Sequence, residues 1–335
     1  ARQLAVLRLL GLFDRPATPD CVQALRDARI PGLSDVLADL SPAEWNSVLS
    51  ELAAAGLVQR TPWERTAIVG YGEEVARQRM EARAERKDFP LGDPQAFTPL
   101  SPALPPDADT LDAHPLLREY FARRLDAERP DAARTGHARL YEHLCASVPY
   151  WPEGETGLRP LYQAVAHGCR AGLIEDACIK VYQNRIGRGA EAYAVKKLGL
   201  FGTELAAVAC FFEQTWQRPA SVLDAATRAW LLNEAAFRLR ALGRLAEAVE
   251  PMRVSGEMDE VREKWQEAAI SYSNLSQLEL MLGELPSLQE AKQMGLDQEE
   301  IEVVKKKVTL AFLAEGETDQ WMCLLFGRQL VGGAA

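Results

Sequence analysis

Hydrophobic residues recur at helical spacing along most of the chain, and most clearly over 229–285. This stretch reads as long amphipathic segments that end on Leu-Gly, first at Leu242-Gly243 and again at Leu282-Gly283. Because glycine adopts left-handed backbone angles without a Cβ penalty, each Leu-Gly indicates the end of a helix and a turn into the next one. Two such units in tandem predict stacked helical hairpins, which bury their apolar faces only against their neighbours.

The same pattern continues toward the N-terminus. Gly172 matches Gly243 in this frame, and the two glycines are about two periods of a 34-residue hairpin repeat apart. We therefore expect a degenerate repeat between them, at 192–212, with its turn at Leu198-Gly199. The longer step from Gly243 to the next turn predicts an insertion at 256–262.

A different arrangement is predicted ahead of the repeats. The hydrophobic pattern gives short helices at 3–13, 21–29 and 33–40. Ser41, Pro42 and Glu44 then have the residue types that begin a helix, as its N-cap, first and third residue, and this helix is expected to reach Ala55.

A strand is predicted after this helix, at 57–60, and its return strand is expected at 110–114. Short helices that lead into a strand and its return strand follow the order of a winged-helix domain. The residues between the strands, 61–109, hold a charged helix-prone segment at 73–87 and then a Pro-rich stretch. We interpret 61–109 as a wing insertion and linker.

Together these patterns predict a predominantly all-α fold, in which a winged-helix domain precedes an α-solenoid. The predicted bounds are 1–128 for the winged-helix domain with its insertion at 61–109, 129–290 for the helical repeats, and 291–335 for a C-terminal helical tail whose role the pattern does not give.

Charge and cysteine usage narrow the class of protein. The 335 residues carry a net charge of -10, which argues against a DNA or RNA surface, because phosphates are bound by clustered Lys and Arg. No run of 18 apolar residues predicts a membrane span. The six cysteines form no CxxC motif and favour free thiols in a reducing cytosol, so we expect a cytoplasmic protein. The chain begins inside a helical pattern without an initiator Met, and we expect it to be part of a longer protein.

Motifs of known chemistry are missing from the sequence. It contains no phosphate-binding P-loop, no HExxH and no GxSxG, and no cysteine and histidine have catalytic spacing. His143 and Cys145 are two residues apart, which points them to different sides of a helix and argues against a shared metal ion. We expect neither a metal site nor an enzyme.

His114 is the histidine with a candidate role. It lies in LDAHPLLREYF, between the predicted return strand and a helix that begins at Pro115. A ring nitrogen at the start of a helix can donate a hydrogen bond to an anion, and the helix dipole adds to the attraction. The alternative is that His114 only packs at the start of the helix.

A candidate binding surface follows from the repeat frame, in which the first helix of each unit faces a concave groove. The groove positions in this frame are Tyr162, Arg170, Asn233, Phe237, Arg240, Ser273 and Gln277. Amide, guanidinium and aromatic side chains of this kind bind peptides and protein surfaces. The alternative for each of them is ordinary solvent exposure or packing.

Several stretches carry a resemblance to a known family. LDAHPLLREYF, LYEHLCASVP, LYQAVAHGCRAGLIEDAC, KKLGLFGTELAAVACFF and WLLNEAAFRLRALGRLAEAVEPM, in this order, resemble the winged-helix and tetratricopeptide-repeat (TPR) region of bacterial STAND-class signalling NTPases. The likeness covers roughly residues 1–290 and fails in 61–109 and in the tail. It implies TPR-like repeats, a role in signalling such as bacterial defence, and an NTPase and an effector domain that this chain does not contain.

The resemblance also bears on His114. In related nucleotide switches, a histidine at the corresponding place contacts the phosphate of bound ADP and helps to hold the resting state. The resemblance therefore implies nucleotide phosphate sensing by His114, with ATP or ADP held by the missing NTPase domain and no cofactor in this chain. The acidic residue that usually follows this histidine is Pro115 here, which is a departure from the family pattern.

Two functions are therefore open from the sequence. The first is a ligand- or protein-sensing and scaffolding region, which binds a peptide or protein partner in the repeat groove and relays binding to the absent NTPase domain by a shift in populations. The second is a winged-helix DNA-binding transcriptional regulator with a TPR sensor. Its recognition helix would carry Glu44 and Glu51 and no Lys or Arg, so it would meet phosphates with the wrong charge.

Overall fold

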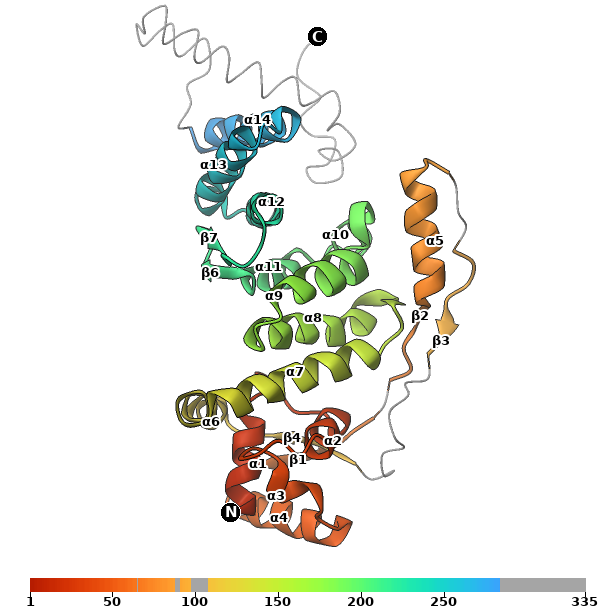
Figure 1. Ribbon diagram of the computed structural model, residues 1–335, viewed down its shortest axis with the longest axis vertical. Coiled ribbons are helices and arrows are strands. Elements are labelled where there is room, and N and C mark those ends of the chain that lie inside the picture. Colours follow the sequence, from red (N-terminus) through yellow and green to blue (C-terminus); the bar gives the residue numbers. More distant parts are fainter. Residues whose placement is uncertain (65, 88–90, 98–107, 284–335) are drawn as a thin grey trace, which may run out of the picture. The chain divides into compact units, whose positions relative to one another are not determined.

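The computed structural model describes residues 1–64, 66–87, 91–97 and 108–283, and over these residues the chain is predominantly helical, as the sequence predicts (Figure 1). The chain forms two compact units, Ala1–Gly199 and Leu200–Ala335, which are described one at a time below. The predicted domain bounds at 128 and 290 stay predictions, and the predicted tail at 291–335 lies outside the described residues. No helix among the described residues is long and apolar enough to span a membrane.

The first unit begins with four helices whose apolar faces meet in a core of leucines. The helices are α1 (Arg2–Leu10), α2 (Pro19–Asp27), α3 (Asp35–Ala38) and α4 (Pro42–Ala54). Leu9, Leu25 and Leu37 are fully buried at this junction. The predicted start of α4 is confirmed, since Ser41 Oγ accepts the Glu44 N–H at 3.3 Å and the Glu44 carboxylate accepts the Ser41 N–H at 3.0 Å.

A pair of strands from distant parts of the sequence closes this group of helices. β1 (Gln59–Pro62) pairs antiparallel with β4 (Asp109–Asp112), which confirms the predicted strand and return strand with bounds moved by one or two residues. Leu111 of β4 also exchanges backbone hydrogen bonds with Ala17, at 2.7 and 2.9 Å. The connection between α1 and α2 is therefore fixed to the strand pair as well.

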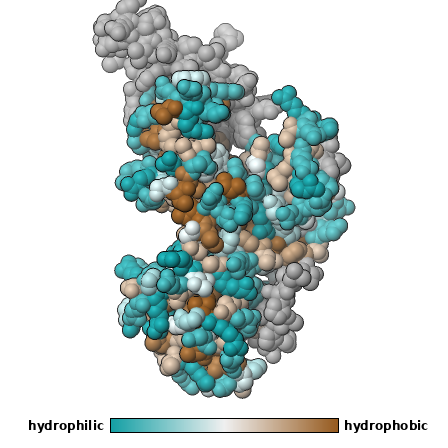
Figure 2. Space-filling view, in the orientation of Figure 1, coloured by the Kyte–Doolittle hydropathy of each residue, from teal (hydrophilic) through white to brown (hydrophobic). Residues whose placement is uncertain are grey.

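The residues between β1 and β4 contain more structure than the predicted loop. The charged helix is confirmed as α5 (Glu73–Ala84), whose surface is largely hydrophilic (Figure 2). The short strands β2 (Val69–Tyr71), β3 (Gln95–Ala96) and β5 (Trp151–Pro152) form a sheet in the order β3-β2-β5, which the sequence analysis missed. The interpretation of the Pro-rich stretch as a linker is wrong at β3, and residues 98–107 lie outside the described residues.

Longer helices complete the first unit. They are α6 (Pro115–Glu128), α7 (Pro130–Ala146), α8 (Gly154–Arg170), α9 (Ile174–Asp176), the π-helix η1 (Ala177–Ile186), the 3-10 helix η2 (Gly189–Glu191) and α10 (Tyr193–Lys196). α7 packs against α8, and α8 packs against η1. Gly168 allows the close approach, because a Cβ there would lie 2.9 Å from the ring of Tyr141. The predicted turn at Gly172 has a φ of +81°, in the left-handed region that glycine favours.

The second unit contains three long helices that pack as consecutive antiparallel partners. Its elements are α11 (Phe201–Ala209), β6 (Phe212–Gln214), β7 (Arg218–Pro219), α12 (Ala225–Ala241), α13 (Leu245–Val261) and α14 (Trp265–Leu282). α12 packs against α13 and α13 against α14. Leu205, Leu239, Ala248 and Leu278 form a buried cluster between these helices.

The predicted glycine turns are confirmed in this part of the chain. Gly199, Gly243 and Gly283 have φ angles of +66°, +74° and +72°. The helix before Gly199, α10, has four residues and is much shorter than a repeat helix. The assignment of 192–212 to a degenerate repeat stays a prediction.

The predicted insertion at 256–262 is wrong. α13 continues through Gly256 to Val261 without a break, and Gly256 is buried against α14, where a Cβ would lie 2.9 Å from Tyr272 Cε1. The long step between Gly243 and Gly283 comes from helix length, since α13 has 17 residues and α14 has 18. The polar pattern of this stretch belongs to a continuous helix, in which Glu257 and Glu260 are exposed and Asp259 is buried.

Candidate functional site

His114 lies where the sequence places it, at the N-cap of α6. Its side chain is exposed, and its Nδ1 accepts the Leu116 N–H at 3.3 Å. A neutral imidazole that accepts a hydrogen bond at Nδ1 carries its proton on Nε2. The Nε2–H of His114 is therefore a donor on the side of the ring away from Leu116. This geometry gives His114 a structural role as a helix cap and leaves the implied contact with a nucleotide phosphate as a prediction.

Five of the predicted groove residues lie on α12 and α14 of the second unit. Asn233, Phe237 and Arg240 follow one another along α12 at spacings of four and three residues, and Ser273 and Gln277 are four residues apart on α14. Such spacings place side chains on one face of a helix.

The two helices are in direct contact through these residues. The Arg240 Nη2 donates to Gln277 Oε1 at 2.9 Å. Phe237 packs against Phe201 of α11, with 6.2 Å between ring centroids. Arg240, Asn233 and Gln277 are half-buried, whereas Ser273 is 3% exposed, which makes Ser273 a poor contact residue.

The other two predicted groove residues, Tyr162 and Arg170, lie on α8 of the first unit. They are eight residues apart, which gives two turns of one helix face. A single groove that contains all seven residues stays a prediction, because the two units are described separately.

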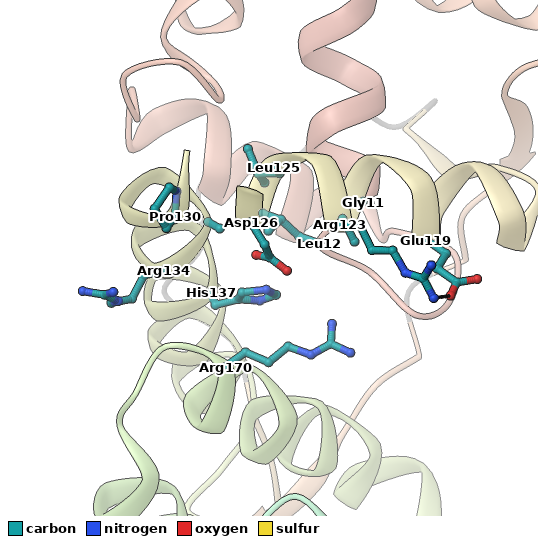
Figure 3. A pocket seen from close by; sticks show the side chains of 12 residues that line it. Gly11, Leu12, Glu119, Arg123, Leu125, Asp126, Pro130, Arg134, His137 and Arg170 are labelled. Carbon is teal, nitrogen blue, oxygen red and sulfur yellow. Dashed lines mark hydrogen bonds and ion pairs between the residues drawn. The ribbon is translucent and has the colours of Figure 1, made fainter. Parts of the chain in front are cut away.

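Arg170 also lines a cavity that the sequence analysis did not foresee (Figure 3). The cavity has a volume of about 520 Å³ and lies between the end of α1 and the helices α6, α7 and α8. Its walls combine apolar groups with charged ones. The lining residues are Gly11, Leu12, Glu119, Ala122, Arg123, Leu125, Asp126, Pro130, Ala133, Arg134, His137 and Arg170.

A pair of buried histidines stands behind this cavity. His137 of α7 lines it, and His167 of α8 lies behind His137, with 2.9 Å between their Nδ1 atoms. Each side chain is 6% exposed. Burial, with the charge of Arg170 and the neighbouring ring, lowers the pKa of His137 to about 3. Burial and Arg170 lower the pKa of His167 to about 4, so both rings are neutral at pH 7.

A third group of polar side chains joins α2 to α7. The His143 Nε2 and the Asp20 Oδ2 are 2.9 Å apart. Cys21 lies beside them, and one side-chain atom of each residue that could bind a metal ion lies within 4.8 Å of the other two. Burial alone would raise the pKa of Asp20, but hydrogen bonds from His143 and Thr18 bring it below its ordinary value. His143 and Asp20 therefore bind each other, and this buried hydrogen bond fixes α7 to α2.

Sequence reasoning missed these groups because their members are far apart in the chain. His137 and His167 are 30 positions apart, and Asp20 and His143 are 123 positions apart. The available signal was that both histidines of α7 fall on its apolar side, next to Ala133 and Leu140 or Leu144.

No family model matches the chain, and no curated protein and no solved structure is similar to it.

Proposed function

We propose that the chain is the sensing and scaffolding region of a STAND-type signalling protein. In this proposal a winged-helix domain is followed by TPR-like repeats, which bind a protein or peptide partner in their concave face. Binding there favours one state of an adjoining NTPase domain outside this chain. The proposal assigns no reaction to the chain itself.

The observation that supports the proposal most is the hydrogen bond between Arg240 and Gln277. It joins α12 to α14, which are the first helices of successive hairpins in the predicted frame. Asn233 and Phe237 continue the same face of α12. A row of amide, guanidinium and aromatic groups along neighbouring helices matches the way in which proteins bind peptide backbones and their side chains.

The packing around the turns supports the repeat assignment. Gly243 and Gly283 both adopt left-handed angles at the end of a long helix, and Gly256 allows α13 and α14 to approach closely. Tandem helical hairpins of this kind share their cores with their neighbours, as Leu239, Ala248 and Leu278 do here.

The position of His114 at the start of α6 supports a role in nucleotide sensing. The cap on Leu116 fixes the ring at the start of α6 with its Nε2–H outward, where it can donate to a phosphate oxygen. All other contacts to the nucleotide would come from the NTPase domain. Pro115 in place of the usual acidic residue remains a departure from the family pattern.

The DNA-binding alternative receives less support. The antiparallel pairing of β1 and β4 after α4 fits a winged-helix domain. However, the guanidinium of Arg60 in the wing binds Asp109 at 2.7 Å and Asn46 at 3.0 Å, and Glu44 and Glu51 lie exposed on α4. This region therefore offers acidic groups and a neutralised arginine to a DNA backbone.

A peptide-display experiment tests the proposed binding function. A random peptide library is selected on the immobilised wild-type chain, and enriched peptides are measured by calorimetry against wild type, Asn233→Ala and Arg240→Ala. Arg253→Ala is the matched control, because Arg253 is an arginine of α13 that pairs only with Glu250 and Glu257 in the described structure.

Peptides that bind wild type and the control equally, and the two groove variants about tenfold or more weakly, would support the proposal. Enriched peptides that bind all four proteins alike would place recognition elsewhere. A library that yields no enriched peptide would count against a peptide-binding groove.

A further inference from the structure

The cavity between α1, α6, α7 and α8 has an unusual distribution of charge. Asp126 comes from α6 and Arg170 from α8, and both side chains reach the space beside the ring of His137 (Figure 3). Neither makes a hydrogen bond or an ion pair with another residue that the structure describes. A carboxylate and a guanidinium thus face one small volume without neutralising each other.

The position of Asp126 is not explained by the stability of α6. It lies two residues before the end of the helix, where the helix dipole favours cations and disfavours acids. Glu128, also in the last turn, is compensated by ion pairs with Arg8 and Arg124. Asp126 has no such compensation among the described residues, so its carboxylate is available to a ligand in the cavity.

The histidine pair adds a ring nitrogen that can either donate or accept a hydrogen bond. Because both rings are neutral, one Nδ1 donates across the 2.9 Å contact and the other accepts. If His167 donates, the Nε2 of His137 is a donor, and if His137 donates, its Nε2 is an acceptor. The ring that lines the cavity can therefore match a donor or an acceptor on a ligand without a change in charge.

The remaining walls combine ion-paired charged groups with apolar ones: Arg123 pairs with Glu119, and Arg134 pairs with Asp131. Leu12, Ala122, Leu125 and Ala133 line the cavity beside the polar groups. A volume of about 520 Å³ lies within the ordinary range for sites that bind small molecules. Apart from the charged groups that are already paired, the site offers the Asp126 carboxylate to a cation and the Arg170 guanidinium to a carboxylate. Leu12, Leu125 and Ala133 are almost fully buried, so Ala122 and Pro130 give the accessible apolar surface.

We propose that this cavity binds a small zwitterion with an aliphatic side chain, namely a free α-amino acid or a dipeptide. Its ammonium group binds Asp126, its carboxylate binds Arg170, and its side chain packs on Ala122 and Pro130. This site is separate from the peptide groove of α12 and α14, and either proposal can fail without the other.

Calorimetry with simple ligands tests the proposal on the whole chain. The probes are L-leucine and leucyl-leucine, leucinamide, which lacks the carboxylate, 4-methylpentanoate, which lacks the ammonium group, and inorganic phosphate. We expect millimolar or tighter binding of a zwitterion and binding about ten- to hundredfold weaker for each analogue with one charge, since each loses a charged hydrogen bond.

Variants of the two charged residues give the second half of the test. Asp126→Asn and Arg170→Ala should each weaken zwitterion binding about ten- to hundredfold. Arg159→Ala is the matched control, because Arg159 is an exposed arginine of the same helix that pairs with Glu155 away from the cavity. Both substituted residues are exposed, so thermal unfolding should show that the variants remain folded.

Three outcomes would overturn the proposal. The first is that neither L-leucine nor leucyl-leucine binds at millimolar concentration. The second is that inorganic phosphate or 4-methylpentanoate binds as tightly as the zwitterions, which would make the cavity a plain anion site. The third is that Asp126→Asn and Arg170→Ala bind like the control.

Discussion

His137 and His167 are neutral in the folded chain, with pKa values lowered to about 3 and about 4, mainly by burial. An unfolded histidine has a pKa of about 6.5 and binds a proton below it. Between these values the unfolded chain binds more protons than the folded chain, so stability falls as the pH falls from 6.5. At pH 7 and above, the two histidines are neutral in both states, so their low pKa values do not reduce the free energy of unfolding.

The pH dependence of unfolding tests this argument. From pH 7.5 to pH 5, we expect the wild-type chain to lose about 2 kcal/mol for each histidine, as measured by urea denaturation with circular dichroism. His137→Gln, which keeps a hydrogen-bonding group, should lose about half as much. Asp14, Asp126, Arg15 and Arg170 are the charged groups near the pair. An equal loss in the two proteins would contradict the argument.

Arg238 gives a second prediction at the scale of single residues. It pairs with Glu204 at 2.8 Å and with Glu234 at 2.7 Å, and the side chains of Arg238 and Glu204 are 4% and 2% exposed. Arg238→Ala would remove the ion pair that compensates the buried Glu204 charge, at a cost of about 3–5 kcal/mol in the free energy of unfolding. Arg253→Ala, on an exposed face, should cost less than about 0.5 kcal/mol in the same urea titration. Similar losses in the two variants would show that the buried pair is not important.

The sequence predicted hydrogen bonds between neighbouring residues, but it did not predict contacts between side chains of different helices. The capping box of Ser41 and Glu44 involves neighbours three positions apart, so residue types alone predict it. The contacts of His137 with His167 and of Arg238 with Glu204 depend on how helices pack. The cavity could not be predicted for the same reason, because Asp126 and Arg170 come from different helices.

At the scale of elements, the sheet β3-β2-β5 depends on a glycine. A Cβ on Gly70 of β2 would lie 2.3 Å from the backbone oxygen of Trp151 in β5, and backbone atoms cannot move away as a side chain can. Long amphipathic helices ended by glycine were predicted well, because their pattern extends over many residues. Strands of two or three residues, such as β2, carry too little pattern to be recognised.

Gly70→Ala should separate β2 from β5. We expect a loss of about 1–3 kcal/mol in the free energy of unfolding, from the overlap with the Trp151 carbonyl. Gly72→Ala is the matched control, because nothing lies within 4 Å of a Cβ at Gly72 and its φ is -70°. Chemical denaturation of both variants measures the difference. Equal stability would mean that the strands are not held as closely as described.

At the scale of the whole molecule, charge gives the clearest prediction. With a net charge of -10 and acidic groups exposed on α4, the chain should not shift random duplex DNA in a gel at low salt. Low salt is the stringent condition, because it favours any contact with phosphates. A shift that disappears as salt is raised would support the DNA-binding alternative instead.

The general architecture followed from the sequence, and its subdivision did not. The spacing of hydrophobic residues predicted a predominantly helical chain, and the long helices from α6 to α14 confirm this. The compact units divide after Gly199, a position that no composition change marks. Which helices share a core depends on their packing, and hydrophobic spacing within one helix does not encode its partner.

The pairing of β1 with β4 has a consequence for the order of events during synthesis. The ribosome must add roughly 50 residues after β1 before its partner strand exists, which takes about 3–10 s at about 5–20 residues per second. Leu111, which also bonds to Ala17, arrives in the same interval. During this interval the helices α1 to α4 have been synthesised, but the strand pair that closes them has not formed, so their leucines are incompletely covered. We expect a chaperone that shields apolar segments to bind the nascent chain mainly at this stage of translation.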